Sequence, residues 1–192
     1  MFGKRINEVI SRPSGELLER FRKYATPDIC DAQIVYDAMD PRIKPWIGNG
    51  TVIGPAFTVK VPDGEGDIVA KAIDMAQEGD VIVVAGHGNC TVSYWGDKRS
   101  VKAYKKGIAG VVVDGAFRDF ADCEKVGFPV FAKGLTMPTA LKTGRGEINV
   151  PVSCGGVVVN PGDIVMGDVN GVCVIAAEYA EEILETLEGR RS

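Results

Sequence analysis

The stretch from 96 to 119 constrains the fold most, because a helical pattern, a stop signal and a buried strand follow one another directly in it. After Asp97, apolar residues recur at helical spacing, and Lys-Lys-Gly at 105–107 ends the pattern. The run 108–113 is apolar and β-branched enough for a buried strand, which Gly115 is expected to end. The stretch therefore predicts a helix that turns back into a strand.

This helix–strand unit also brings charged residues together. The helix and the strand run antiparallel, so the helix start and the strand end lie at the same sheet edge, where open α/β sheets usually bind ligands. Asp97, Arg118 and Asp119 should therefore be neighbours. An arginine can hold a carboxylate through two charge-assisted hydrogen bonds, and a carboxylate can hold Mg²⁺ largely through water. Together, the arginine and the two carboxylates suit a small anionic oxo acid whose enolate needs positive charge nearby. The alternative is that Arg118 and Asp119 form an ordinary surface ion pair.

The spacing of these residues resembles a known signature. Twenty residues separate Asp97 from Arg118-Asp119, as in the D-X20-R-D pattern of the class II pyruvate aldolases that cleave 4-hydroxy-4-methyl-2-oxoglutarate and 4-carboxy-4-hydroxy-2-oxoadipate. These enzymes form one structural family with the regulator of ribonuclease E activity A (RraA). The resemblance extends over most of the chain and includes TPDICDA at 26–32, IGPAFT at 53–58, PVFA at 129–132, PGD at 161–163 and DVNGV at 168–172.

The resemblance implies an α/β fold, specifically an α-β-β-α sandwich of the swivelling-domain type, with residues 1–192 forming a single RraA-like domain. It also implies a homotrimer, often stacked as a homohexamer, with sites between subunits. Aldolase relatives place a C-terminal glutamate in a neighbour's site, and the candidates here are Glu178, Glu181, Glu182 and Glu185.

The implied function is that of a divalent-metal-dependent aldolase that cleaves a 4-hydroxy-2-oxo acid to pyruvate, with oxaloacetate decarboxylation as a side activity. Asp119 would anchor Mg²⁺ or Mn²⁺. Arg118 would hold the pyruvyl portion and stabilise the enolate. Asp97 would position a metal-bound water, and it is also the candidate proton-transfer group.

Substrate binding would extend to the start of the helix. The resemblance assigns this role to Gly96, Lys98 and Arg99, since backbone N–H groups at a helix N-terminus bind anions. The Lys98-Arg99 pair is more basic than the apolar pair often found there, which leaves open an extra anionic group on the substrate.

The rival interpretation is a non-catalytic regulator that binds a ribonuclease. The regulator branch departs from the aldolase signature at the acidic residue after its arginine, and this chain keeps Asp119 there, which favours the enzyme. A third interpretation is a methyltransferase, which is an old label in this family. The sequence contains no methyl-donor loop that would support it.

Composition sets the remaining expectations. The formal net charge of −4 argues mildly against a nucleic-acid partner, and no apolar run is long enough for a membrane span or a signal peptide. A cytoplasmic protein is therefore expected, and the resemblance implies a small 2-oxo acid as its partner. The five cysteines form no CxxC pair and should remain reduced.

Local patterns give further expectations. Thr26 should cap a helix that begins with Pro27, and 41–50 should be a loop. The segment 86–90 (GHGNC) should be a tight turn, since it lacks the third glycine of a dinucleotide fingerprint. His87 within it is better explained as a satisfied loop histidine than as a general base. Asp163 and Asp168 should stabilise turns by accepting hydrogen bonds from nearby backbone N–H groups.

Overall fold

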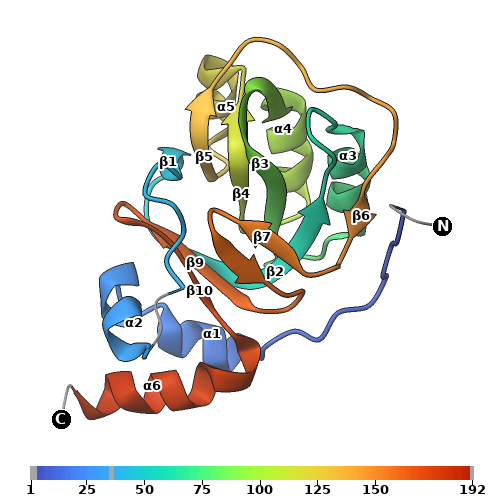
Figure 1. Ribbon diagram of the computed structural model, residues 1–192. Helices are drawn as coiled ribbons and strands as arrows, with labels where there is room; N and C mark the ends of the chain where they lie inside the picture. Colours follow the sequence, from blue (N-terminus) through green and yellow to red (C-terminus); the bar gives the residue numbers. More distant parts are fainter. Residues whose placement is uncertain (1–3, 35–36, 191–192) are drawn as a thin grey trace.

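The computed structural model describes residues 4–34 and 37–190, and a mixed sheet forms the centre of the molecule (Figure 1). Within these residues the sheet has eight strands in the order β1-β5-β4-β3-β2-β9-β10, with β6 paired to β2. The main-sheet strands are β1 Lys44–Ile47, β2 Val52–Lys60, β3 Val81–Trp95, β4 Gly110–Phe117, β5 Val130–Leu135, β6 Glu147–Ile148, β9 Ile164–Asp168 and β10 Gly171–Ile175. A separate hairpin is formed by β7 Val152–Cys154 and β8 Val157–Val159.

Strands β2 to β5 are parallel, and the strands beyond them at both edges are antiparallel. Both faces of the parallel strands are covered, which explains their continuous apolar runs, such as VIVV at 81–84. All of β4 is buried. The carboxyl ends of the four strands consequently meet at one edge.

The helices form two groups on different parts of the sheet (Figure 1). Helices α3 Asp67–Met75, α4 Asp97–Lys105 and α5 Phe120–Val126 cover one face of the parallel strands. Helices α1 Gly15–Phe21, α2 Thr26–Ala32 and α6 Ala180–Gly189 pack against β9 and β10, and a 3₁₀ helix at Ala177–Tyr179 precedes α6.

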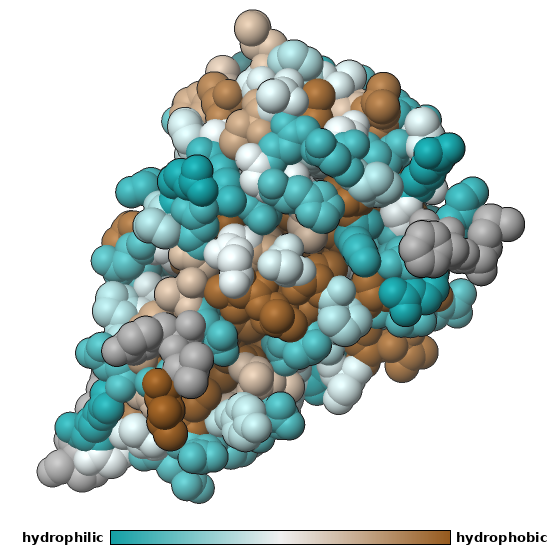
Figure 2. Space-filling model, in the orientation of Figure 1, coloured by the Kyte–Doolittle hydropathy of each residue, from teal (hydrophilic) through white to brown (hydrophobic). Residues whose placement is uncertain are grey.

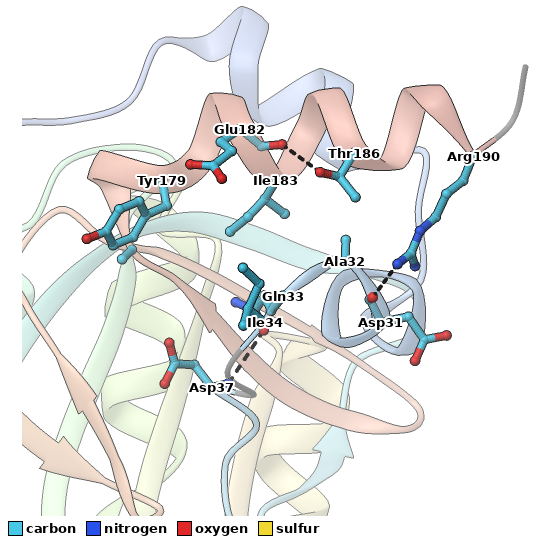
Figure 3. A pocket seen from close by; sticks show the side chains of 11 residues that line it. Asp31, Ala32, Gln33, Ile34, Asp37, Tyr179, Glu182, Ile183, Thr186 and Arg190 are labelled. Carbon is cyan, nitrogen blue, oxygen red and sulfur yellow. Dashed lines mark hydrogen bonds between the residues drawn. The ribbon is translucent and has the colours of Figure 1, made fainter.

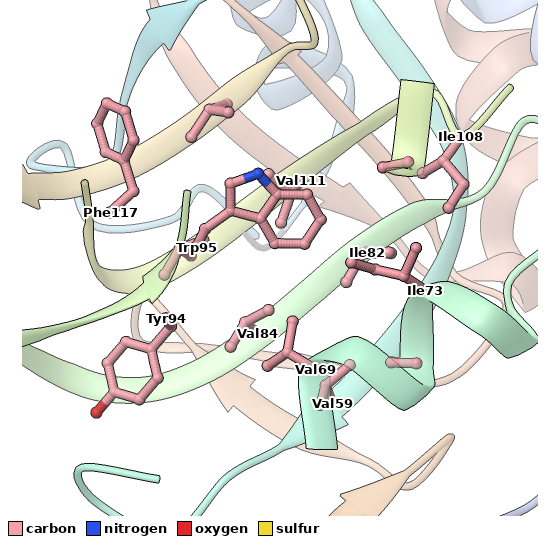
Figure 4. Close-up of a cluster of buried hydrophobic side chains, with 14 of the residues drawn as sticks. Val59, Val69, Ile73, Ile82, Val84, Tyr94, Trp95, Ile108, Val111 and Phe117 are labelled. Carbon is pink, nitrogen blue, oxygen red and sulfur yellow. The ribbon is translucent and has the colours of Figure 1, made fainter. Parts of the chain in front are cut away.

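The core lies on both faces of the sheet. Under α3 to α5, Trp95 stacks on Phe128 with 5.6 Å between ring centroids, and Figure 4 shows it among the aliphatic side chains of the strands. On the other face, the hairpin β7–β8 packs on residues such as Val83 and Val112. The α/β sandwich expected from the sequence is confirmed.

Two expectations about the strands were wrong. The segment 41–50 is not entirely loop, because β1 pairs with β5 and the indole N–H of Trp46 donates to the Ala132 carbonyl at 3.0 Å. Gly115 does not end the strand, since β4 continues to Phe117. A Cβ on Gly115 would lie 2.8 Å from the Asn89 carbonyl oxygen, so the glycine serves close packing rather than termination.

Strand β3 is interrupted where the sequence predicts a tight turn. Its pairing with β4 shifts register between Val84 and Asn89, and His87 and Gly88 have φ angles of 57° and 73°. The chain therefore bulges out of the sheet at these residues and then rejoins it. A ring nitrogen of His87 lies 2.9 Å from the Val61 carbonyl oxygen, in keeping with a satisfied loop histidine.

Thr26 does not cap its helix as predicted. The N-cap position of α2 is Ala25, whose N–H donates to the Asp28 carboxylate at 2.9 Å. The backbone N–H and the hydroxyl of Thr26 donate instead to Asp168, at 2.9 Å and 2.7 Å. Asp168 also accepts a hydrogen bond from the N–H of Asn170 at 2.8 Å, which is the turn role predicted for it.

Two sequence expectations concern the chain as a whole. All five cysteines are free. In the described ranges, 4–34 and 37–190, the helices all fall short of the length and apolarity needed to span a bilayer.

Candidate functional site

The candidate site lies at the carboxyl edge of the parallel strands, where β3 leads into α4 and β4 leads into α5. The backbone N–H of Arg118 donates to the Trp95 carbonyl at 3.1 Å, which places Arg118 beside Gly96 at the start of α4. Asp97 is the first residue of that helix and Asp119 directly follows Arg118. The structure thus brings the three signature residues to one edge.

Asp119 occupies an uncommon backbone conformation at the start of α5. Its φ and ψ angles of 60° and 41° are left-handed, a region that aspartate tolerates better than most residues. A Cβ built on Gly96 would lie 2.8 Å from the Oδ2 atom of Asp119. The absence of a side chain at Gly96 therefore lets this carboxylate lie against the N-terminus of α4.

Arg118 and Asp119 form an ion pair that stays accessible. Their Nε and Oδ2 atoms are 3.2 Å apart, and the two side chains are 40% and 33% exposed. Such an exposed pair adds little to stability. Its position beside a helix N-terminus places a guanidinium, a carboxylate and backbone N–H groups around one point, which suits an anionic ligand.

A chain of buried hydrogen bonds fixes this geometry. The indole N–H of Trp95 donates to the Ser100 hydroxyl at 2.9 Å, and that hydroxyl lies 3.6 Å from the Cys123 sulfur. The thiol in turn lies 3.5 Å from the Arg118 carbonyl oxygen. Burial raises the pKa of Cys123, so the thiol stays protonated and can donate. Sequence reasoning missed this chain because its members lie on three different elements.

The two basic residues after Asp97 lie differently. Lys98 is exposed in the first turn of α4. Arg99 is partly buried, and its guanidinium donates to the Gly66 carbonyl at 2.7 Å and to the Tyr94 carbonyl. Burial lowers the pKa of Arg99, and the charge of Asp67 opposes this shift. The Arg99 side chain therefore ties α4 to the start of α3.

A hollow opens beside the ion pair. It measures about 430 Å³ and is lined by Arg118, Asp119, Phe120, Leu135, Thr136 and Met137. The backbone N–H of Thr136 donates to the Phe117 carbonyl at 2.9 Å, which fixes the end of β5 as the second wall. A hollow of this size accommodates a small organic acid.

The donor set fits one kind of metal. Within the described part of the chain, the structure groups no three His, Cys, Asp or Glu side chains as a possible metal site, so a closed zinc-type cage is not formed there. Mg²⁺ commonly binds through one or two carboxylates and water. Asp119, with Asp97 on the adjoining helix end, fits that mode.

A second pocket lies between α2 and α6, at the opposite end of the molecule from α5 (Figures 1 and 3). It measures about 520 Å³ and includes Asp31 and Glu182 in its lining. The guanidinium of Arg190 donates to the Asp31 carbonyl at 2.7 Å across one side of it. The C-terminal glutamates of this chain are therefore remote from its own Arg118.

Known proteins resemble this chain over most of its length. The family model described as RraA-like, Aldolase/RraA, matches residues 26–174. The chain belongs to this RraA-like family. A protein of Halalkalibacterium halodurans provisionally named 4-hydroxy-4-methyl-2-oxoglutarate aldolase is 40% identical over 95% of this chain and 87% of its own.

Solved RraA structures share the fold. RraAS2 of Streptomyces coelicolor, described as an unusual member of the RNase ES inhibitor RraA family, has a TM-score of 0.82 at 27% identity, covering 94% of this chain and 95% of its own. The RNA-processing inhibitor RraA of Thermus thermophilis has a TM-score of 0.73 at 30% identity, covering 79% and 92%. The RraA-like family thus supports either an aldolase or a regulatory role for this chain.

Proposed function

We propose that this RraA-like protein is a divalent-metal-dependent lyase that cleaves a 4-hydroxy-2-oxo acid to release pyruvate. The observation that carries the proposal is the placement of the Asp119 carboxylate against the side-chain-free Gly96, with Arg118 paired to it at 3.2 Å. Aldolase names among the relatives support the same reaction class. Oxaloacetate decarboxylation passes through the same enolate and is proposed as a side activity.

Each residue has a distinct part in the reaction. Arg118 binds the substrate carboxylate through charge-assisted hydrogen bonds, and the first backbone N–H groups of α4, including those of Lys98 and Arg99, face the anionic end. Asp97 positions a water that accepts the proton of the C4 hydroxyl as the C3–C4 bond breaks and the electron pair of that bond forms the enolate. Asp119 would hold Mg²⁺ or Mn²⁺, which when bound supplies positive charge that favours an enolate.

We also propose that the site is completed in a homotrimer or hexamer. Helix α6 and helix α5 lie at opposite ends of the molecule (Figure 1). Arg118 and Asp119 directly precede α5, so the glutamates of α6 can reach such a site only in another copy. Sedimentation velocity should give the mass of three or six chains, and a stable monomer would contradict this part of the proposal.

The test is pyruvate release from 4-hydroxy-4-methyl-2-oxoglutarate and from oxaloacetate, with Mg²⁺ and with a chelator. Wild type should release pyruvate only with metal, and Asp119→Ala should lose at least about a hundredfold in kcat/KM because an electrostatic contribution of this kind is removed. Asp122→Ala is the matched control, since Asp122 is 62% exposed on the same helix and pairs with Lys125. Metal-dependent release that survives in Asp119→Ala would reject the proposal.

The second candidate function is inhibition of a ribonuclease by contact, which the names of the similar RraA structures favour. A pull-down with ribonuclease E at physiological salt tests it. Retention of the ribonuclease, together with no pyruvate release from folded, metal-loaded protein, would favour the regulator over the enzyme.

A further inference from the structure

Two cysteines that are far apart in the chain lie on elements that pack together. Cys30 belongs to α2 and Cys173 belongs to β10. Both lie in the apolar cluster between these elements and α6, where Cys173 is 1% exposed and Cys30 is partly buried. The neighbours of Cys173 on the strand, Val172 and Val174, belong to the core on the other face of the sheet. Because side chains alternate along a strand, Cys173 points toward the helices.

Hydrogen bonds on both sides of Cys30 hold its helix against the strands. Thr26, one turn before Cys30, donates to Asp168 at the end of β9. The side-chain amide of Gln33 donates to the Val174 carbonyl at 2.8 Å. Residues three and four positions apart share one face of a helix. Thr26, Cys30 and Gln33 therefore all face the β9–β10 hairpin.

The two thiols interact directly. The S–H group of Cys173 donates a hydrogen bond to the sulfur of Cys30. Accepting this bond lowers the pKa of Cys30 to about 7, although burial acts in the opposite direction. The same bond, together with burial, raises the pKa of Cys173. Because the thiolate is the reactive form, Cys30 is the member that reacts first and Cys173 is the thiol beside it.

We propose that Cys30 and Cys173 are a redox-active pair, which a peroxide converts to a disulfide that joins α2 to β10. Figure 2 shows hydrophilic side chains over much of the surface at the end of the molecule that α2 and α6 form, so a water-soluble oxidant can approach it. Intracellular disulfides are usually transient and redox-sensing, and a pair of this kind fits that use. The inference is independent of the proposed lyase function.

The oxidation balances in two steps. The Cys30 thiolate attacks one oxygen of hydrogen peroxide, the O–O bond breaks, and a sulfenic acid forms. The hydroxide that leaves takes up the proton released by Cys30 and becomes water. The Cys173 sulfur then attacks the sulfenic sulfur, the S–O bond breaks, and the hydroxyl leaves with the Cys173 proton as a second water. The two sulfurs lose two electrons in total, and the peroxide oxygens gain them.

The test counts thiols in the full-length protein with Cys90→Ser, because the exposed Cys90 would react on its own. Four of the five cysteines then remain. Hydrogen peroxide, at a dose that oxidises added free cysteine, should lower the thiols titrated after denaturation from four to two. Dithiothreitol should restore all four. Mass mapping without reduction should join the peptide that contains Cys30 to the peptide that contains Cys173.

Further variants in the same background locate the bond. Cys173→Ser should form no disulfide, and dimedone should then trap Cys30 as its sulfenic acid. Cys30→Ser, at a partly buried position, should also form none, and it keeps the test valid if Cys173→Ser fails to fold. Cys123→Ser is the matched control, since Cys123 is buried but lies beside Ser100 rather than another cysteine. It should still lose two thiols.

The outcomes decide the proposal. Loss of two thiols that requires both Cys30 and Cys173 and is reversed by dithiothreitol would support it. Retention of all four thiols at the stated peroxide dose would overturn it. A disulfide that still forms in Cys30→Ser or in Cys173→Ser would assign the bond to other cysteines and would also overturn it.

Discussion

At the scale of single residues, position 96 shows how the absence of a side chain shapes the site. Gly96 has extended backbone angles of −173° and −171°, which any residue can adopt, so the backbone alone does not require glycine. The requirement comes from Asp119, because a Cβ at position 96 would lie only 2.8 Å from its Oδ2 atom. The glycine is therefore explained by the proximity of the carboxylate.

Gly96→Ala should consequently lower activity more than stability. The added methyl group displaces the Asp119 carboxylate, and a displacement near 1 Å can reduce rates about a hundredfold. Steady-state kinetics and thermal melting check this, with Gly15→Ala as a control at a position where a Cβ meets nothing within 4 Å. Wild-type kcat/KM in Gly96→Ala would show that the carboxylate position is unimportant.

At the scale of elements, Asp168 joins the end of β9 to the start of α2. It is buried and accepts hydrogen bonds from Thr26 and Asn170. Burial tends to raise its pKa, but these hydrogen bonds prevail and hold the pKa below its ordinary value. A depressed pKa means that Asp168 contributes stability above its unfolded-state pKa, which is lost as the pH falls through the folded-state value.

Asp168→Asn should therefore reduce the free energy of unfolding by about 2 kcal/mol at pH 7, the size expected for hydrogen bonds to a charged group. The difference from wild type should narrow as the pH falls below about 4, the ordinary aspartate pKa, because the carboxylate of the unfolded chain then binds protons before that of the folded protein. Urea denaturation across this pH range measures it. Asp28→Asn, which changes a single hydrogen bond on an exposed residue of the same helix, should have a smaller effect. A pH-independent difference would contradict the linkage.

At the scale of the whole molecule, Lys133 holds separate layers together. Its ammonium lies 2.6 Å from Asp114 on β4 and 3.1 Å from Asp40 before β1, and the lysine side chain is only 10% exposed. Asp114 also accepts from the backbone N–H of Gly155 at 3.0 Å, which links the hairpin β7–β8 to the sheet. Three parts of the chain therefore meet at one buried charge network.

Lys133→Met should destabilise the protein by about 3–5 kcal/mol, because the Asp114 carboxylate would lose its cation in a buried setting, whereas Asp40 keeps its ion pair with Arg42. Lys102→Met is the matched control, since Lys102 is 44% exposed and pairs with Asp74 on the surface. That pair should contribute less than about 1 kcal/mol. Chemical denaturation of both variants measures the contrast, and equal effects would show that burial does not matter at Lys133.

The sequence by itself determined the features that depend on neighbouring residues and on a long recognisable pattern. The helical stripe after Asp97, the stop at Gly107 and the apolar run into β4 follow from local periodicity. The helix–strand unit predicted that Asp97 and Arg118-Asp119 share one sheet edge, and the spacing between them indicated the family.

Only the tertiary structure decided contacts between residues far apart in the chain. It directed Thr26 to Asp168 rather than to its own helix, turned Arg99 toward Gly66, and brought Leu135 and Met137 to the hollow that Arg118 also lines. Periodicity specifies which face of an element is buried, but not which distant side chain lies against it. Those partners are fixed only when the elements pack, because hydrogen bonds and apolar contacts across the sheet then select one arrangement.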